Sequence, residues 1–151
     1  MRNTVPASLR YDAVDMKTLL VDNGSTLFRK LRQSVPGEIT VRSWNNLESF
    51  DPDSFDAVVL SGGSLFEIVG NEKRLKNEIR LIHDTKKPLI GICFGCELIA
   101  DAFDGRLVRD VGDHCGLTEI YVTQPSMIFG DRTSFSVYEH HRWRIHDLPR
   151  D

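Results

Sequence analysis

The sequence predicts an α/β fold with a mainly parallel central sheet and a β-rich C-terminal portion. Two observations lead to this prediction. Between residues 17 and 103, short apolar runs of the kind that form buried strands alternate with segments of helical periodicity. Beyond Gly105 the pattern changes to short segments with β character. Strands that alternate with helices form a parallel sheet covered on both faces.

The composition is that of one ordinary globular domain. The 151 residues are 40% hydrophobic and 27% charged, and the net charge of −3 gives no reason to expect nucleic acid or an anionic membrane as partner. No apolar run approaches the roughly 18 residues of a membrane span, and the first fifteen residues lack a secretory signal. Three cysteines, an odd number, favour reduced thiols over a disulfide framework. We therefore predict a cytoplasmic protein.

The domain is predicted to occupy residues 16–151, after a flexible N-terminal extension of residues 1–15 that has no clear periodicity. Leu19–Val21 is a short apolar run that predicts a buried strand, and a helix is expected over Ser25–Gln33. A half-buried strand is then expected over Glu38–Ser43. The inner stripe of the first helix is expected to comprise Leu27, Phe28 and Leu31.

The second half of the sheet has the same alternation. Ala57–Leu60 predicts a buried strand that stops at Ser61-Gly62-Gly63, and Glu72–Asp84 predicts a surface helix with one apolar stripe. Pro88–Cys93 predicts a further strand, followed at once by a helix. The surface helix carries its stripe at Leu75, Ile79 and Ile82. Four short β segments in hairpin-like order are expected at residues 107–108, 118–123, 135–138 and 142–146.

The segment Gly91-Ile92-Cys93-Phe94-Gly95 has the pattern of a nucleophile elbow. Glycines on both sides let the backbone bend tightly, and the cysteine is held at the carboxyl end of a strand. The helix N-terminus that follows favours the thiolate form of Cys93. A lone cysteine more often simply fills a strand end, but this context favours a nucleophile.

A second glycine turn strengthens the prediction of a site. Gly62 and Gly63 end the preceding strand, and in a parallel sheet they lie beside the elbow. Unhindered glycine N–H groups next to a nucleophile can form an oxyanion hole together with the N–H of Phe94. Alone, such a turn would indicate an ordinary strand-to-helix connection.

These residues resemble class I, triad-type glutamine amidotransferases. Leu60–Gly63 and Pro88–Gly95 look like the oxyanion strand and nucleophile elbow of that family. Leu20–Gly24 and Val137–His141 resemble its first strand and a later strand, most closely those of the amidotransferase part of GMP synthase. The match spans about residues 17–147. The resemblance implies a flavodoxin-like three-layer sandwich.

The resemblance also implies a chemistry. Cys93 would attack the side-chain amide of glutamine, form a glutamyl thioester and release ammonia to a synthetase domain or subunit. Gly63 and Phe94 would supply the oxyanion N–H groups, while Gly62, Gly95 and Glu97 would contact the substrate. No metal or organic cofactor is implied.

The sequence departs from the family pattern at two places. The family's general base is a histidine in a Phe-His-Pro-Glu segment, and no His-Pro dipeptide occurs here, so the domain is expected to be C-terminally incomplete and its status as an enzyme stays open. Glu97 stands where the family usually has glutamine, and an ionised carboxylate only accepts hydrogen bonds. His140 and His141 point to opposite faces of a strand, and His141 is expected at the rim of the site.

Two alternatives therefore remain open. One is a catalytically degenerate protein that binds a ligand or regulates a partner, and the other is a thiol hydrolase that acts on γ-glutamyl compounds. Without the family's last strands, an exposed sheet edge and apolar face would invite homodimerisation or aggregation.

Overall fold

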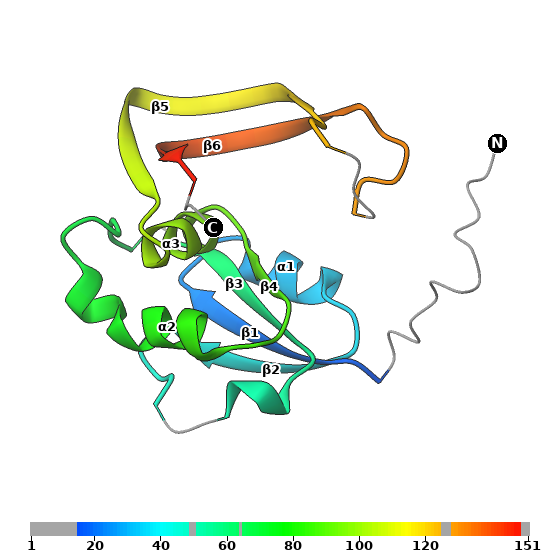
Figure 1. Ribbon diagram of the computed structural model, residues 1–151, viewed down its shortest axis with the longest axis vertical. Helices are drawn as coiled ribbons and strands as arrows, with labels where there is room; N and C mark the ends of the chain where they lie inside the picture. Colours follow the sequence, from blue (N-terminus) through cyan, green and yellow to red (C-terminus); the bar gives the residue numbers. More distant parts are fainter. Residues whose placement is uncertain (1–14, 49–50, 64, 125–127, 149–151) are drawn as a thin grey trace.

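The computed structural model describes residues 15–48, 51–63, 65–124 and 128–148. Four parallel strands form the central sheet in the order β2-β1-β3-β4, and two further strands form an antiparallel ribbon above it (Figure 1). The predicted α/β fold is thereby confirmed. In chain order the elements are β1 (Lys17–Asn23), α1 (Phe28–Ser34), β2 (Glu38–Ser43), a 3-10 turn (Pro52–Ser54), β3 (Ala57–Gly63), α2 (Glu72–Asp84), β4 (Leu89–Gly91), α3 (Phe94–Ala102), β5 (Arg106–Tyr121) and β6 (Ser134–Asp147).

The core lies on the face of the sheet that α2 and α3 cover. Side chains alternate between the two faces of a strand, so Leu19 and Val21 of β1 point to the same side. Both are fully buried and pack with Leu60 of β3 and with apolar residues of the two helices. Leu20 points to the other face, where α1 lies, and is also fully buried. The helices of this chain therefore enclose the central strands from both sides.

Helix α2 has the predicted bounds, but α1 begins three residues later than expected. The Ser25 carbonyl accepts from the N–H of Phe28, and the Ser25 hydroxyl accepts from the N–H of Leu27. These bonds close a turn before the helix can start. Leu27 consequently lies outside the helix and is 60% exposed, so its predicted place in the inner stripe is wrong.

Strand β3 does not stop at Leu60 as predicted. It continues through Ser61-Gly62-Gly63, and Gly63 still pairs with Asn23 of β1. Strand β4 is shorter than predicted, with only Leu89–Gly91 in the ladder. The glycine segment is thus part of the sheet at its carboxyl edge, which fixes its position more firmly than a loop would.

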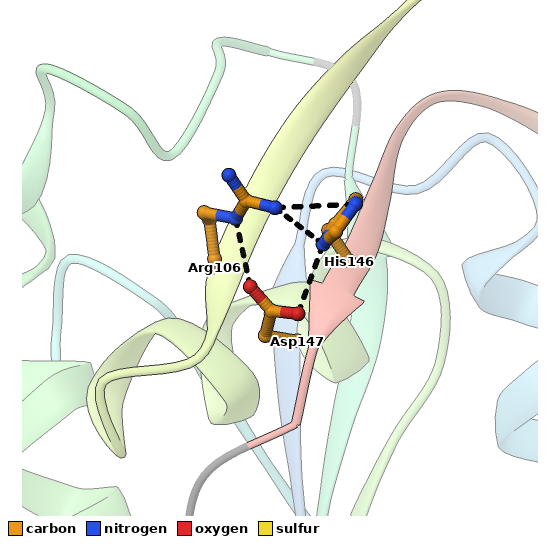
Figure 2. Close-up of polar contacts among 3 residues, drawn as sticks. All are labelled: Arg106, His146 and Asp147. Carbon is orange, nitrogen blue, oxygen red and sulfur yellow. Dashed lines mark hydrogen bonds and ion pairs between the residues drawn. The ribbon is translucent and has the colours of Figure 1, made fainter.

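The C-terminal β segments form two long strands instead of four short ones. Strands β5 and β6 pair from Arg106 to Arg109 and again from His114 to Tyr121, with irregularities between Arg106 and Leu107 and between Arg109 and His114. At its base Arg106 forms an ion pair with Asp147, at 2.8 Å between Nε and Oδ2, and also contacts His146 (Figure 2). The start of strand β5 lies against α3, where the half-buried Leu107 packs against the core.

Residues 1–14 lie outside the described residues, and with them almost all of the predicted N-terminal extension. Within the part of the chain that is described, no helix is both long enough and apolar enough to cross a membrane.

Candidate functional site

Cys93 lies between the end of β4 and the start of α3 in a conformation that side chains rarely adopt. Its backbone has φ 52° and ψ −113°. Such outliers cost on the order of 1–3 kcal/mol and persist where the surroundings over-determine them. Here the N–H of Gly95 donates to the carbonyl of Ile92 at 3.1 Å, and the N–H of Glu97 donates to the carbonyl of Cys93 at 3.0 Å. The strained turn exposes the thiol at the surface, as a nucleophile elbow does.

The glycines on either side of Cys93 are required by close backbone packing. A Cβ on Gly91 would lie 2.5 Å from the amide nitrogen of Cys96. A Cβ on Gly95 would lie 2.5 Å from the carbonyl oxygen of Leu60. Neither position has room for a side chain, because α3 turns back directly over β4 and crosses β3. The Gly-x-Cys-x-Gly spacing is therefore a steric requirement of this fold.

The second glycine turn lies beside the elbow, as the parallel sheet predicted. A Cβ on Gly62 would lie 3.6 Å from the Cβ of Cys93, which is ordinary contact distance. A Cβ on Gly63 would lie 3.3 Å from the Phe94 ring and 2.5 Å from the Asn23 carbonyl oxygen. Residues Gly62, Gly63, Cys93 and Phe94 are thus brought together at the carboxyl edge of the sheet.

A buried polar network beneath this edge was not predicted. The N–H of Asn23 donates to the Ser61 hydroxyl at 2.9 Å, and the Asn23 side-chain amide donates to the Ser61 carbonyl at 3.1 Å. The same amide donates to Glu78 of α2 at 2.9 Å, and the Ser61 hydroxyl donates to the Gly62 carbonyl at 2.9 Å. The sequence signal was available, since Glu78 lies three residues after Leu75 and four before Ile82, on the apolar stripe.

The environment of Cys93 does not favour the thiolate, contrary to the prediction from the helix N-terminus. Loss of hydration raises the pKa of the Cys93 thiol above its ordinary value, and the neighbouring Glu97 carboxyl raises it further. The N–H of Phe94 acts on this pKa in the opposite direction but does not prevail. The thiol is exposed on one side, yet enough protein surrounds the other for desolvation to dominate.

Glu97 lies one helical turn after Cys93 and is only partly exposed. Burial raises the pKa of the Glu97 carboxyl to about 7, so near neutral pH a large share of the molecules carry it protonated. Burial also raises the pKa of the Cys96 thiol, and the Glu97 carboxyl adds to that shift. The acid–base properties of this turn are therefore set mainly by desolvation.

His141 lies on β6 among carboxylates. Its ring nitrogens are 3.7 Å from Asp110 and 3.7 Å from Glu139, and Asp110 also pairs with Arg144 at 2.9 Å. His140 is exposed on the opposite face of the ribbon, as the alternation of a strand predicted. Across the described ranges, no group of three or more His, Cys, Asp or Glu side chains is arranged to hold a metal ion.

A family model described as glutamine amidotransferase class-I matches residues 19–151. This chain belongs to the class-I glutamine amidotransferase family. The resemblance indicated by the glycine turns and the elbow is thereby confirmed, and the amidotransferase match extends beyond them over both strands of the ribbon.

Curated relatives of this amidotransferase chain include a GMP synthase (glutamine-hydrolyzing) subunit of Thermoplasma acidophilum. It is 33% identical over 141 residues, which cover 90% of this chain and 69% of the relative. GMP synthase (glutamine-hydrolyzing) of Vibrio atlanticus is 25% identical over 146 residues, which cover 91% of this chain and 27% of that protein. The chain thus corresponds to about a quarter of the longer relative.

Solved structures of amidotransferases share the fold. A Thermoplasma acidophilum protein assigned as one of the subunits of GMP synthase superposes with a TM-score of 0.73 at 28% identity, over 91% of this chain and 70% of that one. A glutamine amidotransferase from Thermotoga maritima superposes with a TM-score of 0.74 at 19% identity, over 89% and 64% of the two chains, a likeness in fold alone. The predicted flavodoxin-like sandwich is confirmed.

Proposed function

We propose that this chain is the glutamine-binding and acylating part of an amidotransferase of the GMP synthase type. The observation that carries the proposal is the strained elbow at Cys93, with the Gly62-Gly63 segment packed beside it, in a chain 33% identical to a GMP synthase subunit. The Cys93 sulfur would attack the side-chain carbonyl carbon of glutamine. The C–N bond would then break, ammonia would leave, and water would hydrolyse the thioester to glutamate.

The oxyanion that forms in this reaction needs hydrogen-bond donors already in place. We assign them to the backbone N–H groups of Gly63 and Phe94, whose residues lie against one another. The N–H of Phe94 already acts on the Cys93 sulfur, since it lowers the thiol pKa in part. Donors fixed by the sheet and the helix start need no rearrangement during the reaction, which is what makes such sites effective.

Substrate binding is assigned to Gly62, Gly95 and Glu97. With its pKa raised to about 7, Glu97 is mainly a neutral acid below neutral pH, with one O–H donor and one carbonyl acceptor. In that form the Glu97 side chain has a hydrogen-bond donor and an acceptor, as the side-chain amide of a glutamine in its place would have. We infer that Glu97 contacts glutamine as the protonated acid, which reconciles this residue with glutamine as substrate.

Acylation also requires a base, because the pKa of the Cys93 thiol is raised. Proton transfer by a positioned group contributes about 10²–10⁴-fold to such reactions. The family assigns this role to a histidine in a Phe-His-Pro-Glu segment, which the printed sequence does not contain. We therefore assign to residues 1–151 the nucleophile, the oxyanion donors and the substrate contacts.

The partner in this proposal is a synthetase domain or subunit that consumes the ammonia, as the names of the relatives suggest. A reducing, cytoplasmic location fits the three free thiols, all of which are exposed.

Glutamine-dependent release of ammonia, measured with and without a GMP synthase partner that lacks its own amidotransferase part, tests the proposal. Because the printed residues lack the family's base, we expect slow release, about 10²–10⁴-fold below that of a site with a positioned base. This release should require Cys93 and be lost in Cys93→Ala, whereas Cys115→Ala, which removes another exposed thiol, retains it. Equal release by Cys93→Ala, or no release from any of these proteins, would contradict the proposed reaction.

A further inference from the structure

Glu78 is a carboxylic acid in the core of the protein. It projects from α2, is 0% exposed, and receives one hydrogen bond, from the Asn23 amide at 2.9 Å. Burying an ionised carboxylate with a single donor is costly, so a group in this position tends to be protonated.

Two oxygen atoms of this same pair are left without a partner among the described residues. They are Oε2 of Glu78 and Oδ1 of Asn23, and both are buried. Both hydrogens of the Asn23 amide are already used, on Glu78 Oε1 and on the Ser61 carbonyl. A single proton on Glu78 Oε2 satisfies both atoms at once, because the acid then donates to Asn23 Oδ1 while it accepts from Asn23 Nδ2.

The pair is connected directly to the glycine turn beside Cys93. Asn23 donates hydrogen bonds to both the hydroxyl and the carbonyl of Ser61, and the Ser61 hydroxyl donates to the Gly62 carbonyl. Asn23 also pairs with Gly63 in the β1–β3 ladder, and its carbonyl oxygen lies 2.5 Å from the position that a Cβ on Gly63 would take, so the two residues are in close contact.

We propose that Glu78 is a positioning residue whose protonated side chain forms a cyclic acid–amide pair with Asn23 and so holds the Ser61-Gly62-Gly63 segment in place against Cys93. The pairing stands on the buried geometry alone. Its consequence for catalysis rests on the proposed function, because the glycine segment matters only if Cys93 is the nucleophile. Loss of the proton places a carboxylate against Asn23 Oδ1, which repels it and loosens the segment.

The surroundings of Glu78 keep it mainly protonated below neutral pH. Burial raises the pKa of the Glu78 carboxyl to about 7, and the hydrogen bond from Asn23 opposes the shift only in part. Charged groups on the adjacent elements do not contribute to the shift. These groups are Asp22 on β1, Glu97 and Asp101 on α3, and Arg74 on α2. The Asp22 carboxylate accepts a hydrogen bond from the N–H of Gly24, and the Arg74 guanidinium lies over the Phe66 ring.

Glu78→Gln tests the pairing, since a glutamine can make both hydrogen bonds without a proton to lose. Wild type should lose thermal stability as the pH rises from 5 to 8, and Glu78→Gln should lose less over the same range. The matched control Glu38→Gln, an exposed carboxyl on β2, should keep the wild-type slope. An unchanged slope in Glu78→Gln would overturn the proposal.

A measurement on the unsubstituted side chain guards against a variant that fails to fold. The carboxyl carbon resonance of Glu78, followed by NMR, should titrate with a midpoint of about 7. A midpoint near the ordinary 4.5 would overturn the pairing.

The positioning role is tested at Cys93, in a Glu97→Gln background so that the titration of Glu97 does not contribute. The rate of labelling by the glutamine-like electrophile diazo-oxo-norleucine is divided by the rate with iodoacetamide, which cancels the titration of the thiol. With a pKa of about 7 the protonated fraction of Glu78 falls roughly tenfold from pH 6 to pH 8, and the ratio should fall with it. Adding Glu78→Gln should abolish that fall.

The two proposals fail in different ways. A ratio that falls equally with and without Glu78→Gln would overturn the positioning role. No labelling by diazo-oxo-norleucine at any pH would overturn the proposed function, whereas the stability and NMR results would still decide whether the acid–amide pair exists.

Discussion

Gly95 of α3 lies against Leu60 of β3 so closely that a Cβ on Gly95 would sit 2.5 Å from the Leu60 carbonyl oxygen. This approach brings the start of the helix down onto the sheet. It also sets the angle at which the chain passes through Cys93, because Gly95 donates its N–H to the carbonyl of Ile92 just before the elbow. The site therefore depends on the absence of one methyl group.

Gly95→Ala should consequently displace α3 from the sheet. Overpacking of this kind costs about 1–3 kcal/mol, and here the obstacle is backbone, which cannot move aside. Urea unfolding of Gly95→Ala beside Gly62→Ala provides the comparison, since the added methyl group of the latter meets its neighbours at 3.6 Å. Equal stability of the two variants would show that the close approach is not maintained in solution.

Replacing Glu97 by glutamine should remove one pH dependence of substrate binding. In wild type the protonated form of Glu97, which we expect to bind glutamine, is depleted as the pH rises through about 7. Glu97→Gln presents the same two hydrogen-bonding groups at every pH. The Kd for glutamine, measured by calorimetry, should rise less between pH 6 and pH 8 in Glu97→Gln than in wild type. A variant with the wild-type pH profile would argue against this contact.

The stability of the whole protein should fall as the pH rises across the neutral range. The pKa values of Glu78 and Glu97 are both raised from 4.5 to about 7 in the folded state, so the folded protein binds more protons than the unfolded chain between those values. Their contribution is fully present below about pH 4.5 and is lost as the pH rises through about 7. For Glu78 the change is on the order of 3 kcal/mol, at about 1.4 kcal/mol per pKa unit.

Chemical denaturation at pH 5, 6, 7 and 8 measures this change directly. Other carboxyls act in the opposite direction at lower pH, since the pKa of Asp147 is lowered by its bond to His146. A free energy of unfolding that rises steadily from pH 5 to pH 8 would contradict the assignment of raised pKa values to the two glutamates.

The short strand β4 forms one edge of the described sheet and should promote self-association. Ile90 on this strand is 54% exposed beside an unpaired backbone edge. Ile90→Lys should shift the protein toward the monomer in sedimentation velocity, whereas Leu117→Lys, on the exposed ribbon, should not. A monodisperse wild-type monomer, or a shift caused only by Leu117→Lys, would contradict a role for this edge.

The parts of the fold that follow from local pattern were predictable from the sequence. The bounds of α2 came from the spacing of Leu75 and Ile82, and the elbow came from glycines on both sides of Cys93, which permit a tight turn. The ribbon was divided wrongly into four segments because Gly112 and Gly116 interrupt the pattern of β5. Pairing with β6 resumes at His114, after Gly112, and continues through Gly116, so the segments on either side belong to one strand.

The electrostatics of the site could not be predicted in the same way. The helix N-terminus suggested a thiolate at Cys93, but the pKa depends on how much water the folded chain removes, and a sequence does not show this. The position of Glu78 on the apolar stripe of α2 indicated that its side chain faces the core, but an acidic residue on a surface helix is ordinarily solvated, so its protonation was not predictable. Its hydrogen-bond partner is Asn23, 55 positions earlier in the chain, and a contact at that separation does not appear in a local pattern.

Mass spectrometry of the protein after reaction with diazo-oxo-norleucine is the most direct test of the central claim, that Cys93 is the nucleophile of a glutamine site. We predict one adduct per chain, on Cys93 alone, which excess glutamine prevents and Cys93→Ala abolishes. Adducts spread over Cys93, Cys96 and Cys115, and unaffected by glutamine, would show three merely accessible thiols and would contradict the claim.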